Sequence, residues 1–225
     1  MGGYMSFTKQ PKRRQIKKLM SKSICTFNGR KGIVSPMYFE SPLARDYCYF
    51  LEFDTSVLKY ESEPLGFIYF NPITQKECQY TPDFKVWFTD GSCCYYEIKY
   101  QRDVNRNSDF ENVFLLEKKE AQAQGSDLLL ITDEFISKRY FFENLVLLYR
   151  YISIELNPTY VNSVIKYLQE NQKVRLGDLI DTTLESCLSI QQLYALIWSQ
   201  QITAALHDEL LSLNTFVSLD EVSKS

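Results

Sequence analysis

The sequence has almost no histidine and no cysteines at the spacing of a zinc site, although these residues form many metal and acid–base sites. The only histidine, His207, lies far along the chain from every carboxylate cluster, which disfavours histidine-based catalysis. The six cysteines include no C-x-x-C pair. A zinc site is therefore not expected, and we interpret the cysteines as reduced thiols.

Long hydrophobic runs are missing as well. No run approaches the ~20 apolar residues of a membrane span, and no signal-peptide core follows the basic N-terminus. We therefore expect a cytoplasmic protein with no membrane partner. Hydrophobic residues make up 45% of the chain and aromatic residues 15%, which is enough apolar material for a packed core.

Acidic residues do not occur in residues 1–39, which hold nine Lys or Arg. The net charge is −7 over residues 40–150 and −5 over residues 151–225. Such a basic arm favours a polyanion, either nucleic acid or an anionic membrane surface, although a solvated tail has the same composition. Taking nucleic acid as the partner, the candidate DNA-backbone contacts are Lys9, Lys12, Arg13, Arg14, Lys17, Lys18 and, unless they form a solvated helix face, Lys118 and Lys119.

Changes in pattern divide the chain into an arm (1–32), a first domain (33–156) and a second domain (157–225), with the break at Asn157-Pro158. A helix should follow Ser41-Pro42, with Glu40 at or within its first turn. The later patterns predict strands over 57–60, 66–70, 79–88 and 93–100, a helix over 109–124, a buried strand over 127–132 and a helix over 139–154. The fold class is therefore α/β, with one strand added in parallel to a mostly antiparallel sheet.

The second domain shows three helical patterns followed by two short strand patterns. The helices are expected over 160–170, 176–181 and 190–198, and the strands over 201–206 and 215–219. Three helices and a hairpin are typical of a winged helix.

The chemistry is concentrated in Tyr80-Thr81-Pro82-Asp83-Phe84 and, one hairpin later, Tyr96-Glu97-Ile98-Lys99. An Asp90-Gly91 turn between the two runs would place Glu97 and Lys99 on one face, with Asp83 opposite. Two carboxylates and the Ile98 carbonyl form a set of hard oxygen ligands that suits Mg²⁺ or Mn²⁺. Lys99 would orient or deprotonate the attacking water, or stabilise charge on a phosphate.

In isolation, the same residues would also fit a structural Pro-Asp turn and an exposed Glu-x-Lys pair on a strand, without a metal site. The preceding Pro-Asp, the intervening Asp-Gly turn and the upstream Glu40 favour a metal site instead. Carboxylates on apolar core strands are also costly unless a cation compensates them. The pattern therefore predicts metal-dependent hydrolysis of a phosphodiester, a reaction that needs no histidine.

These motifs resemble the TnsA endonuclease subunits of Tn-seven-like transposons. The resemblance runs from about residue 30 to residue 150, with an extension through the second domain. It rests on Phe39-Glu40-Ser41-Pro42-Leu43, Phe50-Leu51-Glu52-Phe53-Asp54, the two runs around Asp83 and Glu97, Leu130-Ile131-Thr132-Asp133-Glu134 and Asn144-Leu145.

The resemblance implies a restriction-endonuclease-like catalytic domain followed by a winged-helix domain. It implies that Glu40, Asp83 and Glu97 bind the metal and that Lys99 is the catalytic lysine, although some members have Gln at the position of Glu97. The expected reaction is cleavage of the 5′ strands at transposon-end DNA, with a TnsB-like transposase and a TnsC-like AAA+ regulator as partners. The protein would be bacterial, and associated with the nucleoid when active.

Two other functions fit the same residues. A stand-alone restriction or repair nuclease would cut DNA without partners. A non-catalytic adaptor would bind DNA and protein and would not need Asp83.

Overall fold

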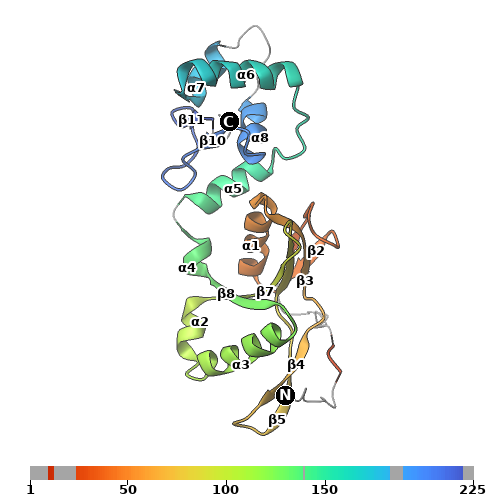
Figure 1. Ribbon diagram of the computed structural model, residues 1–225. Coiled ribbons are helices and arrows are strands. Elements are labelled where there is room, and N and C mark those ends of the chain that lie inside the picture. The colour runs from red at the N-terminus through yellow and green to blue at the C-terminus, as the bar shows by residue number, and fades with distance from the viewer. Residues whose placement is uncertain (1–9, 13–23, 139, 183–189, 220–225) are drawn as a thin grey trace. The chain divides into compact units, whose positions relative to one another are not determined.

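The computed structural model describes residues 10–12, 24–138, 140–182 and 190–219 (Figure 1). The chain divides into two compact units, Met1–Ile136 and Ser137–Ser225. None of the helices formed by the described residues is long and apolar enough to cross a membrane.

The first unit is a mixed α/β fold around a four-stranded sheet with the order β3-β6-β7-β8. The first three strands are antiparallel neighbours, and β8 joins β7 in parallel, as the sequence predicts. Two short hairpins, β1-β2 and β4-β5, accompany the sheet. The elements are β1 (Cys25–Phe27), β2 (Met37–Phe39), α1 (Pro42–Phe53), β3 (Val57–Ser62), β4 (Phe67–Asn71), β5 (Lys76–Tyr80), β6 (Phe84–Phe88), β7 (Cys93–Lys99), α2 (Gln101–Arg106), α3 (Phe110–Ala123), β8 (Asp127–Thr132) and α4 (Asp133–Ile136).

Helices α1 and α3 pack on opposite faces of this sheet (Figure 1). Tyr47 of α1 contacts the rings of Phe84 and Tyr96, which lie opposite each other on β6 and β7. The next residue along β7, Tyr95, instead packs in a buried cluster with Ala121 of α3. Since alternate residues of a strand face opposite sides, α3 and Glu97 share one face of the sheet and α1 lies on the other.

In the first unit, two predicted strands differ from the structure. The predicted strand over 79–88 is two strands, because the chain leaves β5 at Thr81 and re-enters the main sheet only at Phe84. The strand over 127–132 is less buried than predicted, because β8 is the edge strand and only Leu128 is buried. Glu40, predicted at or within the first turn of a helix, lies immediately before Ser41, the N-cap of α1.

Gly66, directly before β4, lies against the backbone at the end of β5. A Cβ atom at this position would lie 1.8 Å from the carbonyl oxygen of Tyr80 and 2.9 Å from the Cα of Thr81. Both are backbone atoms, so no side chain can rotate away to make room.

Gly66→Ala is therefore expected to lower the free energy of unfolding by about 2–4 kcal/mol. The measurement is guanidinium unfolding followed by the fluorescence of Trp87 in a Trp198→Phe background. Gly91→Ala is the control: φ is 85° there and no atom lies within 4 Å of the added Cβ, so only the backbone strain of about 1 kcal/mol should appear. Equal losses in the two variants would contradict the close-approach argument.

The second unit combines helices with a three-stranded antiparallel sheet of order β10-β11-β9. Strand β9 was not predicted. The helix expected over 139–154 is shorter, and it packs against α8, which places it in the second unit, whereas the sequence placed the domain boundary at residue 157. The elements are α5 (Phe141–Tyr149), α6 (Pro158–Asn171), β9 (Lys173–Arg175), α7 (Leu176–Thr182), α8 (Ile190–Trp198), β10 (Thr203–Ala204) and β11 (Phe216–Ser218).

Candidate active site

Asp83 and Glu97 are brought together by the β6–β7 hairpin that turns at Asp90-Gly91. Phe84 lies opposite Tyr96, so Asp83, one residue earlier, lies opposite Glu97. The backbone N–H of Asp83 donates to the Tyr96 carbonyl at 3.0 Å, and its Oδ2 accepts the N–H of Ile98 at 2.8 Å. The sequence assigned Ile98 a role through its carbonyl oxygen, whereas this contact uses its N–H.

Glu97 is a buried carboxylate with a partner on each oxygen. Its side chain is 6% exposed; Oε1 lies 2.5 Å from Lys99 Nζ, and Oε2 accepts a 2.6 Å hydrogen bond from the Tyr80 hydroxyl. Burial raises the pKa of Glu97, and the charge of Asp83 raises it further, while Lys99 and Tyr80 oppose the rise. A cation placed between the two carboxylates would relieve the same penalty.

A pocket of about 470 Å³ opens beside this pair. Glu97 and Lys99 line it from β7, Tyr80 from β5 and Glu117 from α3. Lys99 is 39% exposed, so its ammonium group can reach a molecule in the pocket while it pairs with Glu97. The arrangement offers oxygen ligands for a divalent cation and a positive charge next to them.

Glu117 is a pocket residue that the sequence interpretation did not assign to the site. Burial and the nearby charge of Glu97 raise the pKa of Glu117 to about 8, although a hydrogen bond with Tyr69 opposes the rise. The sequence did carry a signal, because Glu117 lies on the same helical stripe as Val113 and Phe114, which otherwise faces the core. Charged residues on an apolar stripe are candidates for function.

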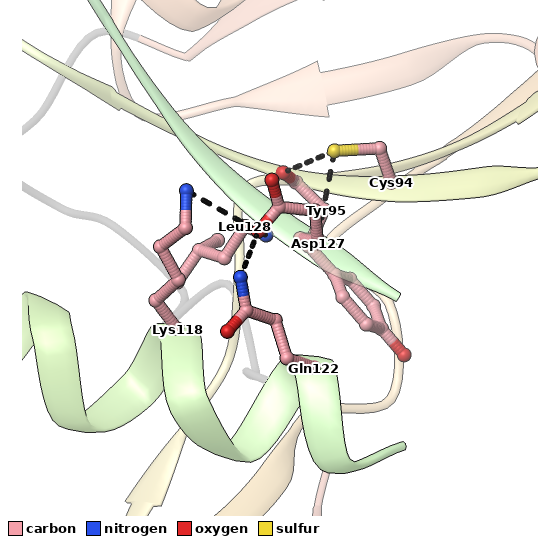
Figure 2. Close-up of polar contacts among 6 residues, drawn as sticks. All are labelled: Cys94, Tyr95, Lys118, Gln122, Asp127 and Leu128. Atoms are coloured by element: carbon pink, nitrogen blue, oxygen red, sulfur yellow. Dashed lines mark hydrogen bonds and ion pairs between the residues drawn. The ribbon is translucent and has the colours of Figure 1, made fainter. Parts of the chain in front are cut away.

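Helix α3 is fixed to the sheet by Asp127 at the start of β8 (Figure 2). Oδ1 of Asp127 accepts from Gln122 at 3.1 Å and from its neighbour's backbone, Leu128 N, at 2.9 Å, and it pairs with Lys118 Nζ at 3.2 Å. Figure 2 also shows the Cys94 thiol reaching the Asp127 carbonyl, at 3.5 Å. These contacts hold the helix that brings Glu117 to the pocket.

The raised pKa of Glu117 predicts how stability depends on pH. A carboxyl group with a raised pKa keeps its proton in the folded state and loses it in the unfolded state, so the free energy of unfolding falls between about pH 4.5 and about pH 8. Glu97 contributes in the same direction. Glu117→Gln, which cannot ionise, should reduce this fall.

The measurement is guanidinium unfolding of the metal-free protein across that pH range, followed by Trp87 fluorescence in a Trp198→Phe background. Glu111→Gln, at an exposed position of the same helix, is the control and should keep the wild-type dependence. An unchanged slope in Glu117→Gln would show that Glu117 ionises normally.

Comparison with known families supports the interpretation of this region. Residues 54–133 match the family model described as TnsA-like endonuclease N terminal. This segment is a TnsA-like endonuclease domain. It contains Asp83, Glu97, Lys99 and Glu117, and a nuclease domain of the TnsA kind hydrolyses phosphodiesters. No curated protein matches the chain.

Glu40, the third predicted acidic residue, lies upstream of the matched TnsA-like segment. It is exposed and follows Phe39, whose ring contacts that of Phe84, the residue after Asp83, at 5.7 Å between centroids. Among the described residues, no three His, Cys, Asp or Glu side chains are arranged to hold a metal. Asp83 and Glu97 therefore remain the carboxylate pair on which the metal prediction rests.

The predicted DNA contacts fall in three different environments. Lys12 is exposed, and its carbonyl accepts hydrogen bonds from Gln79 at 2.6 Å and Thr81 at 3.4 Å, both of which line the pocket. Lys118 is paired with Asp127, whereas Lys119 on the same helix is exposed. Lys9, Arg13, Arg14, Lys17 and Lys18 lie outside the described residues.

The single histidine lies in the second unit, outside the TnsA-like segment. The His207 ring stacks on Phe141, with 3.9 Å between centroids and 15° between planes. This contact gives the histidine a packing role within the second unit.

Proposed function

We propose that the protein is a metal-dependent DNA endonuclease that cleaves the 5′ strands at transposon ends as part of a heteromeric transposase. The observation that carries the proposal is the pair of buried carboxylates of a TnsA-like domain: Asp83 lies opposite Glu97, and Glu97 lines a pocket together with Lys99. A buried carboxylate whose pKa is raised by burial and by the neighbouring charge of Asp83, as that of Glu97 is, fits a hard divalent cation.

In the proposed mechanism, Asp83 and Glu97 hold Mg²⁺ or Mn²⁺, with Glu40 and the Ile98 carbonyl as further candidate ligands. The bound ion would supply charge stabilisation at the phosphate and lower the pKa of a bound water. Tyr80 fixes one oxygen of Glu97 by its hydrogen bond, which leaves the carboxylate in one orientation. Lys99 places its charge where a phosphate or an attacking water would enter the pocket.

The partners follow from the same proposal. The first unit would be restriction-endonuclease-like and would bind transposon-end DNA, with Lys12 at the pocket and Lys119 as backbone contacts. After α5, the described part of the second unit has the order α6, β9, α7, α8, β10, β11, which is the order expected of a winged helix. The net charge of −5 over residues 151–225, which form most of this unit, disfavours DNA and suits a protein such as a TnsC-like AAA+ regulator, while a TnsB-like transposase would cut the other strands.

The test combines this protein with its cognate transposase, regulator and targeting proteins on a donor element in Mg²⁺. Wild type should free the element completely, and Asp83→Asn should leave the 5′ strands joined while the 3′ ends are still cut. Clean excision by Asp83→Asn would support the adaptor function instead. Cutting of DNA by the isolated protein in Mg²⁺ would support a stand-alone nuclease.

A further inference from the structure

One wall of the catalytic pocket is aromatic and carries no catalytic charge. Phe110 and Phe114 of α3 line the pocket with their rings stacked, 5.7 Å between centroids and 13° between planes. Val113 lies beside them. Val113 and Phe114 also pack against the buried cluster around Ala121, so this aromatic surface continues the core and at the same time faces the cavity.

Two side-chain amides line the same pocket. Asn107 is exposed at the pocket; its Oδ1 accepts from Asp109 N at 3.1 Å, and its NH₂ group has no partner among the described residues. Gln79 donates its NH₂ to the Lys12 carbonyl, which leaves its oxygen as an acceptor. These two amides thus give the pocket that holds the rings a donor and an acceptor, the kind of groups that read the edge of a nucleobase.

The size of the pocket limits what can occupy it. Its volume of about 470 Å³ is in the range of small-molecule sites and could take one nucleotide, whereas a base-paired duplex could not enter. A nucleotide with its phosphate at Lys99 and Glu97 would extend its base toward α3. Aromatic side chains bind bases of any sequence through their faces, so the wall would give affinity without sequence specificity.

We propose that the pocket accepts one unstacked nucleotide of the cut strand, with its base against Phe110 and Phe114 and its edge toward Asn107. This inference rests on the proposed function, because it places the scissile phosphate at the carboxylate pair. It predicts a preference for DNA in which the nucleotide at the cut is mispaired, since extruding such a nucleotide costs least.

The first experiment measures occupancy without cleavage. The full-length protein is titrated, in Ca²⁺, with a deoxynucleoside 5′-monophosphate and with 2-deoxyribose 5-phosphate, which lacks the base, while the phenylalanine ring resonances are followed by NMR. The monophosphate should bind about fivefold to a hundredfold more tightly and should shift the rings of Phe110 and Phe114. The sugar phosphate should leave those rings unshifted.

Matched variants test whether the aromatic wall causes the tighter binding of the monophosphate. Phe114→Leu keeps an apolar side chain but removes the ring, and should abolish the advantage of the base; Phe135→Leu, on α4 and outside the pocket, should keep it. Asn107→Ala should reduce the differences among bases, and Asn112→Ala, exposed on α3 and outside the pocket, should not. Asp83→Asn should weaken binding of both ligands equally in Ca²⁺.

The outcomes separate this inference from the proposed function. Equal affinity for the two ligands, or unshifted rings in wild type, would overturn the nucleotide site while Ca²⁺-dependent binding still supported the nuclease. If neither ligand bound with a divalent ion present, the proposed metal site itself would fail. The ring shifts are read in wild type, so the inference remains testable even if Phe114→Leu does not fold.

Discussion

Replacement of Lys99 by methionine is expected to slow strand cleavage by about 10²- to 10³-fold, because it removes a preorganised positive charge from the reacting phosphate. Lys99 Nζ lies 2.5 Å from Glu97 Oε1 in the pocket and is held there by that pairing. Methionine keeps much of the length and apolar stem of lysine. Packing is therefore largely kept, and the loss of the charge should appear in the cleavage rate of the folded protein.

The measurement is the rate of 5′-strand cleavage in the reconstituted excision reaction at saturating DNA. Lys119→Met, at an exposed position of α3, is the control and should cleave within a few-fold of wild type. Lys99→Arg should recover only part of the rate, because a planar guanidinium group differs in size and geometry from an ammonium. A Lys99→Met protein that cleaves at the wild-type rate would remove the lysine from the mechanism.

The same substitution has a second consequence for Glu97. Lys99 opposes the rise in the pKa of Glu97 that burial and Asp83 cause, so its loss raises that pKa further. Metal ions bind the ionised carboxylate. The pH at half-maximal Mn²⁺ binding should consequently move upward in Lys99→Met, and a shift to lower pH would contradict the pairing.

The centre of this site could be predicted from sequence because its geometry is local. Asp90-Gly91 between two β-rich runs predicts the hairpin, and strand alternation then places Glu97 and Lys99 on one face. The structure has this hairpin, with Phe84 opposite Tyr96. The metal-binding roles of Asp83, Glu97 and Glu40 stay predictions.

The partners of these residues depend on long-range packing that no local pattern encodes. Tyr80 reaches Glu97 only because β5 pairs with β4 outside the main sheet, whereas the sequence continued β5 into β6. Glu117 reaches the pocket because α3 returns over the sheet face that carries Glu97. Periodicity found the helix but could not say which face of the sheet it would cover.

Short elements were the other source of error. Strand β9 was missed because Lys173–Arg175 is too short for an alternation pattern, and it is a strand only because β11 pairs with it. Helix α8 was predicted with its observed bounds, Ile190–Trp198, since its apolar residues recur strongly at helical spacing. Local periodicity thus predicts elements of two turns or more, and tertiary pairing decides the rest.

The second large effect is expected in the second unit, at Asn144. This side chain is 1% exposed and makes three hydrogen bonds to a distant backbone segment. Its Nδ2 donates to the carbonyls of Leu206 at 2.9 Å and Glu209 at 2.8 Å, and its Oδ1 accepts from Leu211 N at 2.9 Å. A single asparagine on α5 therefore satisfies three backbone groups of a segment that has no regular structure.

Asn144→Leu should lower the free energy of unfolding of the second unit by about 3 kcal/mol or more, because leucine fills a similar volume but leaves buried backbone groups without partners. The chain has two tryptophans, so Trp198 reports this unit alone in a Trp87→Phe background during guanidinium unfolding. Asn162→Leu, exposed on α6, is the control and should change stability by less than about 0.5 kcal/mol. Trp87 in a Trp198→Phe background should report an unchanged stability of the first unit. An Asn144→Leu protein as stable as wild type would mean that the segment around Leu206 is held by packing rather than by these hydrogen bonds.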